Sequence, residues 1–369
     1  MAGRRLQDLR DYFRQPPVML ALLAGLAVIF FAAVTGLSRA YQAQREALGQ
    51  RWFSRGLADL KAQRFDSAMT EFRSALLYSR DDYAYQLNLA EALIGLKRTS
   101  EASAYLVNLW DRQPEDGLVN LELARIEAQK GQTEEALRYY HDAIYSAWPS
   151  DQESKRREAR LELVEFLLST RGKAQAQSEL IALEENMGDD PAQQERMGDL
   201  FLRAQDYEHA LAAYRVSLKT ERDNAAALAG AGAAAFQLGR YPQALRYLQA
   251  AVAANPDDTQ SAERLKMAEM VVEMDPFRRQ IPVAQRDRIV MEAFATAGER
   301  VKTCGGEAQA SWAQMNPRIT ELGLKRNPDL VEAAMDLVFA IERQSSGSCG
   351  SGSGKDAALL LIAKLHEGN

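Results

Sequence analysis

The chain has 369 residues, of which 47% are hydrophobic and 26% are charged, a composition typical of folded proteins. Its formal net charge of −6, without any cluster of Lys and Arg among aromatic residues, argues against binding to DNA or RNA, so we expect no nucleic-acid partner. The two cysteines, Cys304 and Cys349, are too few for a zinc framework and form no Cys-x-x-Cys redox motif.

The first 37 residues have the pattern of a membrane anchor. Residues 1–17 form a basic tail with four arginines, Arg4, Arg5, Arg10 and Arg14. Residues 18–37 contain no charge and have about the length that crosses the hydrocarbon core of a lipid bilayer, roughly 30 Å. We therefore predict a transmembrane helix there. A cleaved signal peptide is the alternative, but the apolar run exceeds the roughly 7–15 residues of a signal core, and Arg39 lies within the candidate cleavage site.

The charges on either side of the span bear on its orientation. Arginines before the span favour a cytoplasmic N-terminus, although Arg39, Arg45 and Arg51 follow it closely. Long domains are translocated largely regardless of their own charge. We predict a single-pass protein of the plasma (inner) membrane, with the N-terminus in the cytoplasm and the rest of the chain outside.

The span also contains small residues at a spacing that lets helices approach closely. Ala21 and Gly25 form one small-xxx-small pair, and Ala32 and Gly36 form another. Two spans could pack through these pairs, which would make the protein a homo-oligomer. Alanine-rich spans also produce such pairs by chance.

Residues 38–49 continue as a polar helical stalk into a series of similar units. An alanine recurs with a period of about 34 residues and one longer gap, at Ala68, Ala102, Ala136, Ala176, Ala210 and Ala244. In the clearest unit, two apolar-periodic runs meet at Gly239 and Arg240 and predict a helix–turn–helix hairpin. Six such units cover residues 50–258.

The units carry the residues of a known repeat motif. The first unit has Trp52, Gly56, Phe65, Ala68, Phe72 and Ala75, and the sixth has Gly232, Gly239, Tyr241, Ala244, Ala251 and Pro256. The fourth unit follows an insertion near residues 148–156, lacks the aromatic residues and has Gly172 one residue out of place. The pattern resembles the tetratricopeptide repeat (TPR) family, which implies an all-α, right-handed superhelix. One hairpin cannot bury its apolar face alone, whereas stacked hairpins share a continuous core.

More helices are expected after the repeats. Residues 259–276 have charged side chains at positions that are small or apolar in earlier units, which indicates a capping helix with a polar outer face. Residues 283–369 form a helical C-terminal region that the resemblance does not cover, with helices expected at 283–303, 307–324 (broken at Pro317), 328–343 and 355–367. Residues 345–354 are rich in Gly and Ser, a composition that predicts a flexible segment without packing.

Both cysteines lie in this C-terminal region. In an exported domain, Cys304 and Cys349 could oxidise to a disulfide, and two unpaired thiols are the alternative. An enzyme with Cys304 as its nucleophile is the alternative function, although no His or Asn lies near this residue in the sequence.

No motif indicates a cofactor or a metal. Residues 350–355 (GSGSGK) lack the first glycine of a phosphate-binding loop and the Ser or Thr that should follow its lysine. The three histidines lie far apart, without the His-Glu-x-x-His spacing of a zinc enzyme. We therefore expect no cofactor, no metal and no catalytic residues, and predict that the protein is not an enzyme.

The resemblance implies that partner proteins or peptides bind the concave face of the superhelix, along the first helix of each hairpin. The matching positions are Phe53, Leu57, Leu87, Glu91, Leu121, Arg125, Glu195, Asp199, Arg203 and Phe236, together with Ala229 and Ala233. Chaperone-binding members grip peptide carboxylates with Lys, Arg and Asn at such positions, whereas most positions here are apolar or acidic. A scaffold without a groove ligand is the simpler alternative.

We predict a membrane-tethered scaffold for protein–protein interaction. The combination of an N-terminal span with these repeats resembles bacterial envelope proteins, which implies a role in the assembly of other envelope proteins.

Overall fold

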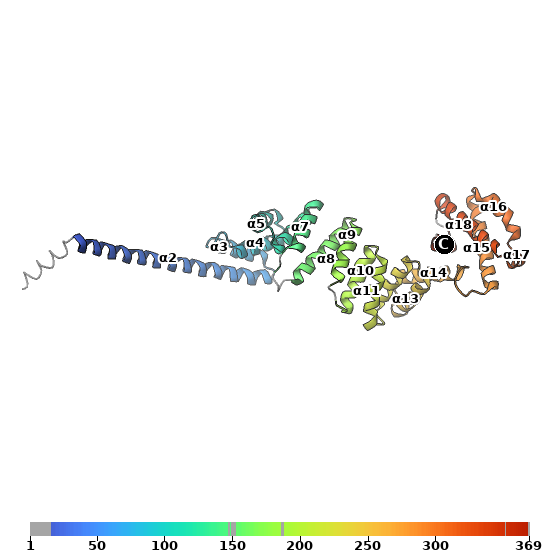
Figure 1. Ribbon diagram of the computed structural model, residues 1–369, viewed down its shortest axis with the longest axis horizontal. Helices are drawn as coiled ribbons and strands as arrows, with labels where there is room; N and C mark the ends of the chain where they lie inside the picture. Colours follow the sequence, from blue (N-terminus) through green and yellow to red (C-terminus); the bar gives the residue numbers. More distant parts are fainter. Residues whose placement is uncertain (1–15, 147, 149–152, 186–187, 351, 368–369) are drawn as a thin grey trace, which may run out of the picture. The chain divides into compact units, whose positions relative to one another are not determined.

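The computed structural model describes residues 16–146, 148, 153–185, 188–350 and 352–367, and within these ranges all regular secondary structure is helical (Figure 1). The predicted basic tail lies outside the described residues, apart from Pro16 and Pro17, which begin the first helix. The chain divides into two compact units, which we call unit 1 (Met1–Leu163) and unit 2 (Val164–Asn369).

Consecutive helices of each unit pack as hairpins. Unit 1 contains α2 (Pro16–Lys61), α3 (Phe65–Leu76), α4 (Tyr83–Gly95), α5 (Thr99–Arg112), α6 (Gly117–Lys130), α7 (Thr133–Tyr145) and the start of α8 (Glu153–Ser169). Unit 2 contains the end of α8, α9 (Lys173–Glu184), α10 (Pro191–Arg203), α11 (Tyr207–Thr220), α12 (Ala225–Gln237), α13 (Tyr241–Ala254), α14 (Thr259–Met274), α15 (Val283–Cys304), α16 (Ala308–Met315), the 3₁₀ helix η2 (Asn316–Arg318), α17 (Glu321–Arg326), α18 (Asp329–Cys349) and α19 (Gly354–His366). Helix α2 pairs with α3, α4 with α5, α6 with α7, α10 with α11, and α12 with α13.

Figure 1 shows α2 as one unbroken helix, and it spans 46 residues. Among the described residues, the side chains of its apolar window are not buried. A window within Leu23–Lys61 has a mean hydropathy of 1.8, so the helix is long and apolar enough to cross a membrane. A membrane span and a signal sequence both meet this description.

The last part of α2 packs against the first hairpin. Arg45 donates hydrogen bonds to the carbonyl oxygens of Leu77 (3.2 Å) and Tyr78 (3.0 Å), just beyond the C-terminal end of α3, where unpaired carbonyls attract a cation. Gly49 lies one turn later, and a Cβ there would be 3.1 Å from the hydroxyl oxygen of Tyr85. The end of the expected stalk is therefore bound to the repeats through side-chain contacts.

A residue with positive φ lies at the turn of each hairpin. These residues are Gln63, Lys97, Gly131, Arg171, Gln205 and Gly239, with φ between 57° and 75°. Neighbours in this series are 34 residues apart, except for the 40 residues between Gly131 and Arg171, which flank the insertion. In the fourth repeat, Arg171 is the residue with left-handed backbone. Gly172, which looked one residue out of place in the sequence, follows the turn and is the N-cap of α9. Left-handed backbone favours glycine, yet four of these six residues are Gln, Lys or Arg. The turn geometry of the repeat is therefore kept even where the sequence lacks the glycine.

Small residues allow close contact between helices of unit 2. The ring of Tyr214, on α11, is fully buried between Gly198 of α10 and Gly230 of α12, and a Cβ on either glycine would overlap the ring. The hydroxyl of Tyr214 donates a 2.5 Å hydrogen bond to Asp199 Oδ1. Gly230 thus serves helix packing.

The C-terminal helices share one core with the last hairpin. Buried side chains of Tyr241 (α13), Val271 (α14), Phe294 (α15), Val338 (α18) and Leu359 (α19) belong to a single cluster. We expected α14 to end the repeats with a polar outer face, but α19 packs against it. Apolar contacts with the C-terminal helices therefore replace the predicted polar end.

The Gly/Ser segment also differs from its prediction. Helix α18 continues to Cys349, and Ser345 is 3% exposed, so residues 345–349 are helical rather than an unpacked linker. Ser345 follows Ile341 by one turn, and both side chains are buried on the core side of α18, whereas Cys349 is exposed. Packing of Ser345 and the disulfide of Cys349 hold the two ends of this stretch against the low helix propensity of Gly and Ser.

Candidate partner-binding surface

The predicted apolar residues of unit 1 lie on successive first helices, spaced by 34 residues. Phe53 is on α2, Leu87 on α4 and Leu121 on α6. Phe53 and Leu87 are half-buried, and the Phe53 ring lies 4.9 Å from that of Tyr85. Leu121 is only 2% exposed, because it packs inside the repeats. The structure therefore corrects the prediction for Leu121, whose side chain a partner cannot contact in the folded chain.

A second row of predicted residues lies one helical turn further along the same helices. It consists of Leu57, which is half-buried, Glu91, which is exposed, and Arg125, whose side chain is 31% exposed. Each lies six residues before the left-handed residue of its hairpin. The repeat period therefore places these three side chains at one equivalent position.

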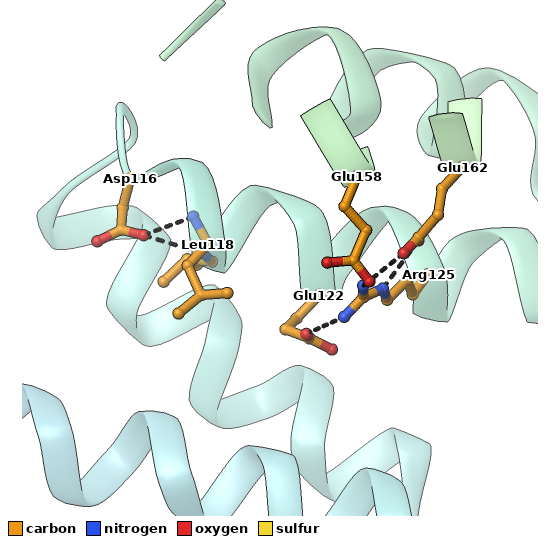
Figure 2. Close-up of polar contacts among 7 residues, drawn as sticks. Asp116, Leu118, Glu122, Arg125, Glu158 and Glu162 are labelled. Atoms are coloured by element: carbon orange, nitrogen blue, oxygen red, sulfur yellow. Dashed lines mark hydrogen bonds and ion pairs between the residues drawn. The ribbon is translucent and has the colours of Figure 1, made fainter. Parts of the chain in front are cut away.

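Arg125 is held by three glutamates (Figure 2). Its guanidinium donates two hydrogen bonds to Glu162 of α8, at 2.9 Å from Nε and 2.5 Å from Nη2. Nη1 donates to Glu122 Oε1 at 2.5 Å, and a Glu158 oxygen lies 4.0 Å from Nη2. Fork-shaped pairing of this kind fixes the plane of the guanidinium. Arg125 is thus engaged within its own unit.

The start of α6 is positioned by an acidic cap. Asp116 accepts hydrogen bonds from the backbone N–H groups of Leu118 and Val119, at 3.0 and 2.9 Å, and so satisfies donors that a helix start leaves unpaired (Figure 2). The Tyr83 hydroxyl of α4 donates to the other carboxylate oxygen of Asp116 at 2.6 Å. These bonds link the first helices that carry Glu91 and Arg125.

Charge around Arg125 is predominantly negative. Burial raises the pKa of the Glu122 carboxyl, and the nearby charges of Glu91 and Glu162 raise it further against the attraction of Arg125. The hydrogen bond to Glu162 is the main cause that raises the pKa of Arg125. Three carboxyl groups, those of Glu122, Glu158 and Glu162, therefore surround one guanidinium, which is not free to bind a carboxylate of a partner.

Unit 2 repeats this arrangement on α10. Arg203 donates to Glu165 of α8 at 3.0 Å from Nη1, with a second contact of 2.8 Å from Nη2. Glu195 accepts a 2.7 Å hydrogen bond from the Asn224 side chain, and Asp199 accepts from Tyr214 as described above. The predicted surface residues of α10 are thus already bonded to neighbouring helices.

Two predicted residues of α12 take part in packing within unit 2. Phe236 is half-buried against the C-terminal core cluster, and its ring lies 5.2 Å from that of Tyr241. Ala233 is 5% exposed. Both side chains are thus engaged, at least in part, in the packing of unit 2.

The sequence did not identify the glutamates that hold the two arginines. They are Glu122, Glu158, Glu162 and Glu165. Three of the four lie on α8, the first helix of the fourth repeat, whose motif was the poorest of the six. Glu91, Arg125 and Asp199 each lie six residues before the left-handed residue of their repeat. The same count back from Arg171 gives Glu165, so this spacing could have identified it.

A second group of polar residues lies among the C-terminal helices. The structure places a disulfide between Cys304 and Cys349, whose Cα atoms are 5.9 Å apart, and a bonded sulfur carries no thiolate for nucleophilic attack. Near the bond, Arg300 Nη2 donates to the carbonyl oxygen of Gly350 at 2.7 Å, and Arg300 Nε lies 3.8 Å from Glu342 Oε2. Among the described residues, no three His, Cys, Asp or Glu side chains are arranged to hold a metal ion.

Glu342 gives unit 2 a pH-dependent stability. The side chain is fully buried, and burial, together with the neighbouring charge of Asp356, raises its pKa to about 7, whereas Arg300 opposes the shift. A carboxyl group whose pKa is raised by folding contributes stability that is complete below its pKa in the unfolded chain, about 4.3. This contribution is lost as the pH rises from there through the folded-state pKa of about 7. Between pH 5 and pH 8 we expect this group to lower the free energy of unfolding of unit 2 by about 2–3 kcal/mol.

Urea unfolding at the two pH values, followed by hydrogen exchange of α18 in the full chain, measures this loss. Glu342→Gln should remove most of the pH dependence, because the amide does not titrate. Glu332→Gln, an exposed change on the same helix, is the matched control and should leave it intact. An unchanged pH dependence in Glu342→Gln would contradict the assignment.

Models of known protein families match two segments of the chain. Both are described as tetratricopeptide repeat, at residues 59–126 and 195–259. No curated protein matches the chain.

Several solved structures are similar to the chain. YrrB, described as a TPR protein with an unusual peptide-binding site, is 16% identical with a TM-score of 0.44, over 53% of this chain and 97% of its own. PilF of Pseudomonas aeruginosa is 17% identical with a TM-score of 0.43, over 60% of this chain and 97% of its own. The TPR domain of P58(IPK) is 13% identical with a TM-score of 0.31, over 86% of this chain and 99% of its own. Because these TM-scores are below 0.5, the assignment rests on the two family models.

The family models agree with the observed hairpins and with the recurrence of the left-handed turns. Repeats of this kind generally mediate protein–protein interaction through the surface that the stacked helices form. The chain is therefore an all-helical protein, in its described residues, that carries tetratricopeptide repeats.

Proposed function

We propose that the protein is a membrane-tethered scaffold that binds partner proteins or peptides on the first helices of its repeats and serves the assembly of envelope proteins. The observation that carries this proposal is the continuity of α2. One helix contains both the apolar segment and the first helix of the first hairpin, with no intervening loop. A partner-binding surface built this way would be held at a set height above the bilayer.

The height follows from helix geometry. From Leu37, at the end of the proposed span, to Phe53 is a rise of roughly 24 Å at 1.5 Å per residue. The bonds from Arg45 to the end of α3 brace this part of the helix against the first hairpin. The same span could also pair with a second copy, since the position of Gly36 leaves the helix surface open.

The proposed orientation places the N-terminus in the cytoplasm and the repeats outside. Three arginines, Arg39, Arg45 and Arg51, follow the span on the side of the repeats. Arg45 has a structural role there, because it donates hydrogen bonds to the carbonyl oxygens of Leu77 and Tyr78. The remaining bias toward a cytoplasmic N-terminus comes from the sequence before the span. A disulfide between Cys304 and Cys349 also suits an oxidising compartment.

Protease accessibility tests the orientation. A membrane-impermeant protease is added to cells whose outer barrier, if any, is open and whose plasma membrane is intact. We expect the repeats to be cut, while a cytoplasmic control protein survives. Repeats that stay uncut until the plasma membrane is lysed would place them in the cytoplasm, and a chain recovered in the soluble fraction would exclude the anchor.

A further inference from the structure

We infer that the surface formed by the first helices of unit 1 selects a partner segment that carries both Lys or Arg and apolar side chains. This inference rests on the proposed function, because it names the class of partner for the same surface. It depends on two rows of side chains on α2, α4 and α6, together with the glutamates of α8 that face Arg125.

The first step concerns charge. Glu91 is exposed and has no ion-pair partner among the described residues, and the Glu158 side chain is 62% exposed and makes only a long contact, 4.0 Å, with Arg125. Arg125 is the cation of the charged row, and Glu122 and Glu162 occupy its donors. The surface thus retains carboxylates that can accept bonds from a partner, while its own guanidinium is neutralised.

The second step concerns the apolar row. Phe53, Leu57 and Leu87 are half-buried and pack against the core cluster of unit 1 from its outer side. They lie on α2 and α4, the first helices of the two hairpins before α6, so apolar side chains lie on the same row of first helices as the carboxylates. A partner segment that matches both features must place apolar side chains beside Lys or Arg.

The third step excludes the opposite charge. An acidic segment or a terminal carboxylate would have to displace Glu162 or Glu122 from Arg125, and would lie next to Glu91 and Glu158 without compensation. Like charges at such short range oppose binding. Charge complementarity therefore favours a cationic partner.

Peptide binding to the full-length protein tests the inference. The protein is placed in phosphatidylcholine nanodiscs, with empty nanodiscs as the blank. Three twelve-residue probes are compared, with alternating Lys and Val, Glu and Val, or Lys and Ser. We expect the Lys/Val peptide to bind at least about tenfold more tightly than either of the others, with an affinity that falls as salt is raised.

Paired variants locate the binding. Glu91→Gln with Glu158→Gln should weaken the Lys/Val peptide by about tenfold. Glu134→Gln with Glu135→Gln removes the same charge from exposed positions of α7, a second helix, and should leave affinity unchanged. Equal or tighter binding of the Glu/Val peptide, equal losses in both double variants, or no binding of any probe would each overturn the inference.

A separate measurement distinguishes this failure from failure of the scaffold itself. A photo-crosslinking amino acid at position 87 is activated in intact membranes, and the crosslinked segment is sequenced. A segment with Lys or Arg beside apolar residues supports the inference. A defined partner segment without Lys or Arg overturns the inference and leaves the scaffold in place, whereas the absence of any crosslinked protein contradicts both.

Discussion

Replacement of Cys304 and Cys349 by Ser is expected to lower the free energy of unfolding of the C-terminal helices by about 4 kcal/mol. The bond joins residues 45 apart in sequence, and in the chain-entropy model a closed loop of this length restricts the unfolded chain by about that amount. It connects the end of α15 to the end of α18, next to the bond from Arg300 to the Gly350 carbonyl. Urea unfolding of the full chain with and without a reductant measures the effect.

The double Ser variant is also the control for the reductant. Reduction should destabilise the natural chain and leave the variant unchanged, because the variant has no bond to break. Equal unfolding of the natural chain with and without reductant would show that the cysteines are not paired in the isolated protein. Thiol labelling of the denatured chain from cells then tests the oxidising compartment that the proposed orientation requires.

Tyr214→Ala should destabilise unit 2 by about 3–5 kcal/mol, the range for removal of a large buried aromatic side chain. The Tyr214 ring is fully buried between two glycines, Gly198 and Gly230, whose helices cannot close the cavity without a shift of their backbones. The bond from the hydroxyl to Asp199 would be lost as well. Thermal unfolding, with hydrogen exchange of α10 and α12, reports the loss.

Tyr214→Phe separates the ring from the hydroxyl. It keeps the packing between the two glycines and removes only the bond to Asp199, at a cost of about 1–3 kcal/mol for a bond to a charged group. Similar losses in the two variants would mean that the hydrogen bond, and not the ring, dominates the contribution of Tyr214.

Two features of the sequence mark the repeat, the recurring small residues and the turn residues, and the small residues were easier to recognise. The recurring alanines and small residues mark where helices approach, and the family models confirm tetratricopeptide repeats in both units. The turn signal was weaker, because only Gly131 and Gly239 are glycines among the six left-handed residues. Gln, Lys and Arg can adopt this conformation at a modest energetic cost, so their side chains do not reveal the turn.

The repeat period places the predicted surface residues at equivalent positions, but it does not show which of their side chains are free. Equivalent positions follow from the period, and the predictions for Phe53, Glu91 and Arg125 used it. Whether a side chain is free to bind a partner depends on what faces it from another helix. The sequence indicated neither the burial of Leu121 nor the glutamates of α8 around Arg125. Their separation in sequence carries no pattern that one chain reveals.

The sequence by itself determined the local structure, because hydrophobic spacing within a hairpin depends on near neighbours alone. It predicted the helical repeats and the long apolar segment of α2. Only the tertiary structure decided that α18 continues through Ser345 to Cys349 and that α19 covers α14. Both outcomes arise from contacts between residues far apart in the chain, such as the disulfide of Cys349 and the packing of α19 on α14, which the local preference of Gly and Ser for irregular structure does not indicate.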